Sequence, residues 1–140
     1  HVFGMHSVIR TVLPGMLDRG SGAIVNVTSI HAVRGQSLTA HYSAAKGAIL
    51  AYTKSLAREK SPDGIRVNAV APGPIDTPLW RGTLSEEEIV DKMAHRSNVI
   101  PMGRLGAADE VAAGIVFLLS PGASYLTGHI MTIDGGEVMN

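Results

Sequence analysis

The sequence predicts an α/β fold with a parallel sheet, and three observations lead to that prediction. Helix-like segments alternate with short strand-like segments along the 140 residues. The first strand-like segment, over 23–27, is a short apolar run with β-branched residues, which is the pattern of a strand covered on both faces in a parallel sheet. The composition is 45% hydrophobic and 17% charged, which suits one globular domain with a core of its own.

The first half of the chain contains two predicted helices and one predicted strand. Apolar side chains recur at helical spacing until a Gly-Ser-Gly segment ends the pattern. A short run with β-branched residues follows, and it predicts a strand that is buried on both faces. The predicted elements are a helix over 2–19, a strand over 23–27, a loop over 29–38 and an Ala- and Leu-rich helix over 39–60.

The second half continues the alternation. Ser85 and Glu88 have the spacing of a capping box, which predicts that a helix begins there. The predicted elements are a strand over 65–70, a proline-rich turn over 71–74, a loop over 75–83, a helix over 85–97, a loop over 98–107, a helix over 109–120 and a strand over 128–133. Strands that alternate with helices in this way imply right-handed crossovers between parallel strands.

Charge and composition argue against several classes of partner. The chain carries 12 basic and 12 acidic residues and no basic run, so neither nucleic acid nor an anionic membrane is an expected partner. No apolar run approaches the roughly 18 residues of a transmembrane helix. The chain has no cysteine, and we expect a cytoplasmic protein without disulfides. Its six histidines lack metal-ligand spacing, so no catalytic metal is expected.

Ser29, Tyr42 and Lys46 form the most informative pattern in the chain. A tyrosine and a lysine four residues apart on a helix lie on the same face, and a lysine ammonium beside a phenol favours the phenolate. Such a tyrosine can pass a proton to or from a substrate oxygen. Ser29 follows a predicted strand, and we expect its hydroxyl to reach the same oxygen. A bare Tyr-x-x-x-Lys also fits an ordinary surface helix.

Five segments, in this order, resemble the short-chain dehydrogenase/reductase family. They are the first strand with Ser29, the helix YSAAKGAILAYTKSLARE, the strand and turn IRVNAVAPGPIDTP, the segment PMGRLGAADEVAAGIVFLLS and the closing TGHIMTIDGG. The sequence is most similar to the branch of 3-oxoacyl-carrier-protein reductases and glucose dehydrogenases. The resemblance implies the C-terminal part of a Rossmann-like, doubly wound parallel sheet with flanking helices.

The resemblance also implies a reaction, namely hydride transfer between NAD(P)(H) and a secondary alcohol or ketone. Tyr42 matches the family's catalytic acid/base. Lys46 matches the residue that activates this tyrosine and binds the nicotinamide ribose. Ser29 matches the residue that orients the substrate carbonyl or alcohol. His31 lies close to this set in a predicted loop, where histidines are usually bystanders.

A second set of residues matches the family's contacts with its cofactor. The turn after the second strand resembles the turn against the nicotinamide ring, although a Pro-Gly pair is more often an ordinary turn. The implied cofactor-binding residues are Tyr42, Lys46, Pro72, Gly73, Ile75 and Thr77. Open α/β sheets place ligands at the carboxyl ends of their strands, where this turn lies. Glycine at position 73 is expected to permit a close approach of the ligand.

Two family features have no counterpart in these 140 residues. No glycine-rich phosphate motif follows a strand, and the residue that selects NAD or NADP is absent, so the cofactor is NAD or NADP. Residues 1–140 are therefore expected to be the C-terminal catalytic portion of one dinucleotide-binding domain. In the family, helices equivalent to 2–19 and 39–60 pair across a two-fold axis, which implies a homodimer or homotetramer.

Two alternatives to a dehydrogenase remain at this point. The chain could be a non-catalytic, truncated paralogue that acts through its oligomerisation helices. Ser43 and Lys46 also match the Ser-x-x-Lys motif of penicillin-recognising acylases. That motif requires SDN and KTG partners, and this sequence contains neither.

Overall fold

The computed structural model describes residues 1–82 and 85–139, and at position 80 the backbone alone. Its centre is a sheet of three parallel strands in the order β1-β2-β3. The strands are β1 (Gly22–Val27), β2 (Ile65–Pro72) and β3 (Ile130–Ile133). Val67 of β2 lies opposite Ile24 of β1. The predicted parallel α/β architecture is confirmed.

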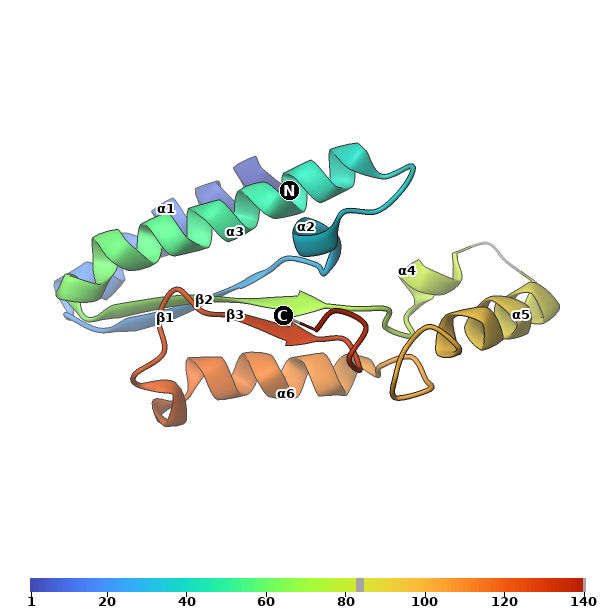
Figure 1. The fold of residues 1–140 in the computed structure, drawn as a ribbon. Coiled ribbons are helices and arrows are strands. Elements are labelled where there is room, and N and C mark those ends of the chain that lie inside the picture. Colours follow the sequence, from blue (N-terminus) through green and yellow to red (C-terminus); the bar gives the residue numbers. More distant parts are fainter. Residues whose placement is uncertain (83–84, 140) are drawn as a thin grey trace.

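Helices cover both faces of this sheet (Figure 1). α1 (Val2–Asp18) and α3 (Ala40–Lys60) lie on one face, and α6 (Ala108–Leu119) lies on the other. The connections β1–α3–β2 and β2–α6–β3 step in the same direction across the sheet but use opposite faces, so they have opposite hands. The first is right-handed, as predicted, and the second is left-handed. The second connection also contains α4 (Pro78–Arg81) and α5 (Glu86–Ser97) before α6, so it is not the compact strand–helix–strand unit to which the right-handed rule applies.

An aliphatic core fills the space between the sheet and the helices α1 and α3. Its buried members are Ile9, Ile24, Leu56, Ala57, Ile65 and Val67. A buried hydrogen bond crosses the same layer, from Asn26 Nδ2 to Thr53 Oγ1 at 2.9 Å. The bond satisfies two polar groups that would otherwise be costly to bury, and it fixes the register of α3 on β1.

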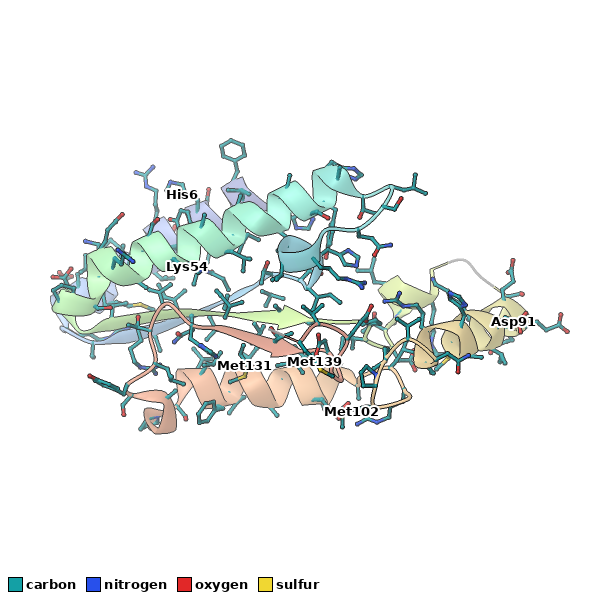
Figure 2. The ribbon with its side chains drawn as sticks, in the orientation of Figure 1. His6, Lys54, Asp91, Met102, Met131 and Met139 are labelled. Atoms are coloured by element: carbon teal, nitrogen blue, oxygen red, sulfur yellow. The ribbon has the colours of Figure 1, made fainter. Side chains whose placement is uncertain are left out.

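A second, smaller core lies between the sheet and α6. Val70, Leu118 and Ala123 are buried there, and Met131 packs against them. Figure 2 shows Met131 between β3 and α6. Successive β2 side chains point to opposite faces of the sheet, which is why Val67 joins the first core and Val70 the second.

The carboxyl ends of the strands point toward a group of three helices, two of them single turns (Figure 1). These are α2 (His31–Arg34), α4 (Pro78–Arg81) and α5 (Glu86–Ser97). The predicted capping box of α5 is confirmed, since Ser85 N donates to Glu88 Oε2 at 2.8 Å and Glu88 N donates to Ser85 Oγ at 3.3 Å. Asp91 lies in the middle of α5 and projects away from the sheet (Figure 2).

Several boundaries differ from the prediction. The predicted loops over 29–38 and 75–83 contain α2 and α4, single turns that are too short to show helical periodicity. The prediction that the first strand is buried on both faces is wrong, because Val27 is 47% exposed. β1 is an edge strand in the described sheet, and α6 covers only part of its second face. Within the described residues, no helix is long and apolar enough to cross a membrane.

Candidate active site

A pocket of about 590 Å³ lies at the carboxyl ends of β1 and β2. It is lined by Ser29, Ile30, His31, Gln36, Thr39, Tyr42, Gly73, Pro74, Ile75, Thr77, Leu79, Lys92 and Arg96. These residues come from the exit of β1, from α2 and the loop that follows it, from the start of α3, from the turn after β2, and from the helices α4 and α5. Pockets of this size at the carboxyl edge of a parallel sheet are the usual ligand sites of open α/β folds.

Ser29 is buried just beyond the end of β1. Backbone bonds on both sides hold this exit segment against β2: Thr28 N donates to Val70 O at 2.9 Å, and Ile30 N donates to Pro72 O at 3.1 Å. The Ser29 hydroxyl accepts a hydrogen bond from the His31 backbone N–H at 3.2 Å. The hydroxyl is thus fixed from within α2, and its proton remains available for another partner.

Tyr42 and Lys46 lie one turn apart on α3, as the spacing predicted. Lys46 is buried, and its Nζ donates to the Val27 carbonyl at 3.0 Å and lies 5.8 Å from the centre of the Tyr42 ring. Thr28 Oγ1 donates in turn to the Lys46 carbonyl at 2.9 Å, which ties this part of α3 to the exit of β1. Burial lowers the pKa of the Lys46 ammonium.

The Tyr42 ring is half-buried between two imidazoles. The rings of His1 and His31 meet it edge-on, with centroid distances of 6.0 Å and 5.7 Å. Burial is the main cause that lowers the pKa of His31, followed by the charges of Arg34 and Arg96. His31 Nδ1 is buried and has no hydrogen-bond partner among the described residues. His31 is therefore part of the pocket wall and not the exposed loop residue that we expected.

The turn after β2 is held by backbone pairing to a distant loop. Gly106 N donates to Pro74 O at 3.0 Å, and Asp76 N donates to Gly106 O at 2.9 Å. Gly73 is required for a reason that the sequence did not show. A Cβ at this position would lie 2.6 Å from Asp134 Cβ and 2.8 Å from Asp134 Cα. The glycine thus permits close packing against the segment after β3, and a ligand is not needed to explain it.

The structure brings five of the seven predicted site residues to one pocket, namely Ser29, Tyr42, Gly73, Ile75 and Thr77. Lys46 lies behind Tyr42 and bonds to the β1 backbone. Pro72 is the last residue of β2 and pairs with Ile133 of β3. The alternative acylase pair does not form, because Ser43 Oγ has no partner within the described residues and Lys46 Nζ is bonded to Val27 O.

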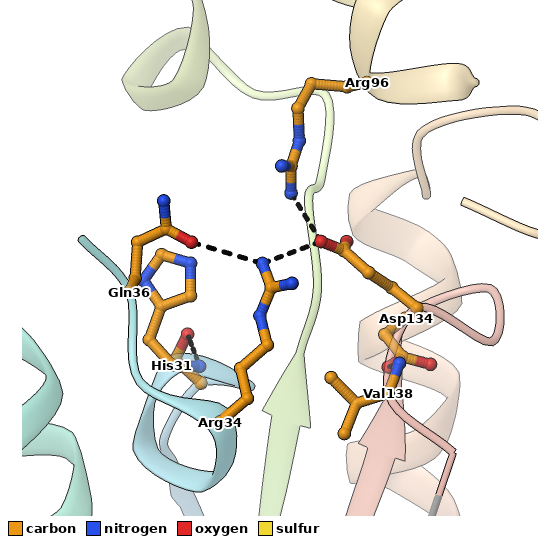
Figure 3. A network of polar contacts seen from close by, with 8 residues as sticks. His31, Arg34, Gln36, Arg96, Asp134 and Val138 are labelled. Carbon is orange, nitrogen blue, oxygen red and sulfur yellow. Dashed lines mark hydrogen bonds and ion pairs between the residues drawn. The ribbon is translucent and has the colours of Figure 1, made fainter. Parts of the chain in front are cut away.

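Sequence reasoning missed a charged cluster at the edge of the pocket (Figure 3). Arg34 Nη2 and Arg96 Nη2 each donate to Glu137 Oε1 at 2.7 Å. The Glu137 side chain is only 1% exposed. No sequence signal could have revealed this cluster, because its members come from α2, α5 and the segment after β3. Across residues 1–82 and 85–139, no three His, Cys, Asp or Glu side chains could hold a metal ion.

Comparison with known proteins identifies the family. The family model described as Enoyl-(Acyl carrier protein) reductase matches residues 1–137 and represents the C-terminal portion of short-chain dehydrogenases/reductases. The chain therefore belongs to the short-chain dehydrogenase/reductase family, as its motifs suggested.

Curated relatives align with nearly the whole chain. It is 46% identical over 138 residues to an uncharacterized oxidoreductase, YmfI, of Bacillus subtilis. That alignment covers 97% of this chain and 54% of YmfI. It is 40% identical to a glucose and ribitol dehydrogenase homolog of rice, over 100% of this chain and 47% of that protein. A 3-oxoacyl-[acyl-carrier-protein] reductase of Vibrio harveyi is 39% identical, over 96% of this chain and 53% of that protein.

Solved structures show the same fold. A 3-oxoacyl-[acyl-carrier protein] reductase of Brucella melitensis superposes with a TM-score of 0.86 at 38% identity, over 98% of this chain and 50% of that one. A 3-oxoacyl-[acyl-carrier protein] reductase of Brucella melitensis with bound NAD superposes with a TM-score of 0.84 at 37% identity, over 98% of this chain and 48% of that one. The chain thus spans about half the length of the relatives that it matches.

Proposed function

We propose that this chain supplies the substrate and nicotinamide side of an NAD(P)-dependent oxidoreductase that interconverts a secondary alcohol and a ketone. The observation that carries the proposal is the convergence of Ser29 and Tyr42 on one pocket, with Lys46 directly behind the tyrosine ring. The chain spans about half of its relatives, so the activity belongs to the complete protein in which these residues lie.

The proton chemistry follows from these three side chains. During reduction, Tyr42 donates the proton that the carbonyl oxygen takes up, and Ser29 donates a hydrogen bond to the same oxygen as negative charge develops there. The bound nicotinamide supplies the hydride to the carbonyl carbon, or accepts it in the reverse direction. Lys46 donates to the Val27 carbonyl, and its ammonium is 5.8 Å from the centre of the tyrosine ring, where a positive charge favours the phenolate.

The residues present fit the nicotinamide end of the cofactor. Ile75 and Thr77 give the pocket one aliphatic and one hydroxyl-bearing wall beside Tyr42, which suits the flat ring and the carboxamide of a nicotinamide. The proposed contacts are those of Tyr42, Lys46, Pro72, Gly73, Ile75 and Thr77. Both NAD and NADP remain candidates, and one Brucella relative contains NAD. The cytoplasmic location stays a prediction.

The proposal is tested by Tyr42→Phe in the full-length protein, assayed with NADH and NADPH against a panel of ketones. Loss of the proton donor is expected to lower kcat by roughly 10²- to 10⁴-fold. Tyr52→Phe is the matched control, because Tyr52 also lies on α3 but bonds to His6 Nδ1 at 2.8 Å, away from the pocket. A Tyr42→Phe variant that keeps kcat within a few-fold of wild type would exclude Tyr42 as the proton donor.

A second proposal concerns self-association through α1 and α3, as a homodimer or homotetramer. α1 exposes the large apolar side chains of Phe3, Val8, Val12 and Leu17, and Phe3 is 87% exposed. Large apolar side chains left exposed along a helix are available to pack against another copy of the chain. Light scattering of the full-length protein and of a Phe3→Ser, Val8→Ser variant tests this, and the variant is expected to have a smaller mass.

A non-catalytic role is the competing function. It is favoured by one relative, 39% identical over 97% of this chain, that is named as an inactive 2-(S)-hydroxypropyl-CoM dehydrogenase 2 of Xanthobacter autotrophicus. If no ketone or alcohol turns over with either cofactor while the protein still forms its oligomer, the role as an interaction module is favoured.

A further inference from the structure

The charges that line the pocket are all of one sign. α5 contributes Lys92 and Arg96 to the lining, and no aspartate or glutamate is found among the lining residues that the structure describes. Three acidic residues of α5, Glu86, Glu87 and Asp91, line a separate surface depression, and the fourth, Glu88, caps the helix by accepting from Ser85 N. α5 therefore gives the pocket lining two basic side chains and no acidic one.

Arg96 is held in place by a buried carboxylate. Glu137 Oε1 accepts from both Arg96 Nη2 and Arg34 Nη2 at 2.7 Å, and the Glu137 side chain is 1% exposed (Figure 3). Two guanidinium groups share one carboxylate, so the three side chains together carry one net positive charge. The ion pair fixes Arg96 but leaves this excess charge beside the pocket.

Arg96 retains hydrogen-bonding capacity. A guanidinium has five N–H donors, and within the described residues only Nη2 of Arg96 makes a hydrogen bond. Its side chain is 24% exposed and belongs to the pocket lining. A guanidinium fixed on one side and accessible on the other is suited to bind a planar oxyanion through two parallel bonds.

The same charges act on His31, which also lines the pocket. Besides burial, the charges of Arg34 and Arg96 each lower the pKa of His31 by more than Glu137 raises it. At this imidazole the two guanidinium groups thus outweigh the buried carboxylate. An uncharged substrate would gain less here than an anion, because a carboxylate replaces the water on Arg96 with stronger, charge-assisted hydrogen bonds.

We propose that the substrate of this pocket is a ketone or secondary alcohol that also carries an oxyanion, such as a carboxylate, and that Arg96 binds this group while Ser29 and Tyr42 hold the reacting oxygen. This inference rests on the proposed oxidoreductase function. It assigns Arg96 as a specificity-determining residue and Glu137 as the residue that positions it.

The test compares matched acids and esters in the full-length protein. The pairs are acetoacetate with methyl acetoacetate, and 4-oxopentanoate with its methyl ester, while 2-oxopropylphosphonate and 2-oxopropanesulfonate distinguish the kind of oxyanion. Wild type is expected to reduce each acid with a kcat/KM roughly 10- to 100-fold above that of its ester, the range expected for hydrogen bonds to a charged group.

Arg96→Gln is expected to lower kcat/KM for the acids by roughly 10- to 100-fold, mainly through KM, and to change the esters by less than about threefold. Arg96→Lys is expected to recover part of the loss, because the charge remains but the fork is lost. Arg58→Gln is the control, since Arg58 is exposed on α3 and does not line the pocket. Circular dichroism and a thermal melt show whether each variant is folded.

The outcomes separate this inference from the proposed function. Equal kcat/KM for acids and esters in wild type, or an equal effect of Arg96→Gln on both, would overturn the oxyanion site and leave the oxidoreductase intact. If no ketone turns over, calorimetric titration with acetoacetate and 4-oxopentanoate decides. Binding that Arg96→Gln weakens at least tenfold supports the oxyanion site alone, and absence of binding to wild type overturns it.

Discussion

The two ends of β2 lie in different surroundings. At its start, Ile65 and Val67 are fully buried among aliphatic side chains of α1, β1 and α3. Beyond its end, the turn that contains Gly73 and Ile75 is half-buried and is held by backbone bonds to Gly106 and to β3. One strand thus passes from a tightly packed core into a pocket wall.

This difference assigns separate physical roles to the two regions. Apolar burial is non-directional and contributes most of the stability, so the core tolerates few changes in volume. The pocket is built from hydrogen bonds and ion pairs between segments that are distant in sequence, and several of its side chains remain accessible. We expect core substitutions to change stability strongly, and substitutions at the pocket to change mainly ligand selection.

The largest expected effect on stability is that of Ile65→Ala in the core. Ile65 is 0% exposed, and removing its side chain is expected to lower the free energy of unfolding by about 2–5 kcal/mol. Leu79→Ala is the matched change in the pocket wall, where Leu79 is 93% exposed, and its effect is expected to stay within about 0.5 kcal/mol. Urea denaturation measures both; equal losses would contradict the distinction between the two regions.

Gly73→Ala lies at the junction of the two regions. The added methyl group would lie 2.6 Å from Asp134 Cβ, so we expect a loss of about 1–3 kcal/mol in the free energy of unfolding. Gly4→Ala serves as the control, because it lies in the first turn of α1 and its added methyl group would meet no neighbouring side chain within 4 Å. That variant is expected to be neutral or to gain at most about 1 kcal/mol. If Gly73→Ala left the free energy of unfolding unchanged, the turn would have to be able to move away from the segment after β3.

The pH dependence of stability distinguishes the regions through His31. Its pKa is below the ordinary value of 6.5 in the folded protein, owing to burial and then to Arg34 and Arg96. As the pH falls below 6.5, the unfolded chain binds a proton at His31 before the folded protein does, so the free energy of unfolding decreases. Denaturation curves between pH 8 and 5 should show this decrease, and His31→Gln should reduce the slope. An unchanged slope would argue against a buried, neutral imidazole at the pocket.

The smallest effect is expected at an exposed ion pair near the turn. Arg104 donates to both carboxylate oxygens of Glu110, at 2.8 Å and 2.7 Å, and this lowers the pKa of Glu110 from 4.5 to about 2. The stabilisation is present above pH 4.5 and is lost as the pH falls toward 2. Glu110→Gln is expected to flatten the acid limb of the stability curve without changing kcat. Since the pair is exposed, a steep acid transition that persists in this variant must arise elsewhere.

Much of the fold could be predicted because its signals are local. The three strands and four long helices were found from apolar runs, helical spacing and the Ser85–Glu88 capping box. The short helices α2 and α4 were missed because a single turn has no periodicity. The hand of the second crossover was predicted wrongly because it depends on which face of the sheet α6 covers.

The candidate site was predictable only in part. Ser29 and Tyr42 were identified from spacing and family motifs, and the structure places both in the pocket. Their catalytic roles remain proposals. His31 was taken for a bystander because its burial depends on α2, and the true neighbour of Gly73 was not foreseen because Asp134 lies after another strand.

The sequence by itself determined the alternation of helices and strands, the family and the residues that we propose as the proton-transfer site. Each depends on residue type and on neighbours a few positions away in the chain. Only the tertiary structure decided the electrostatics of the pocket, because Arg34, Arg96 and Glu137 meet in space from three separate segments. Coulomb interactions depend on distance in space and on burial, and neither can be read from positions in a sequence.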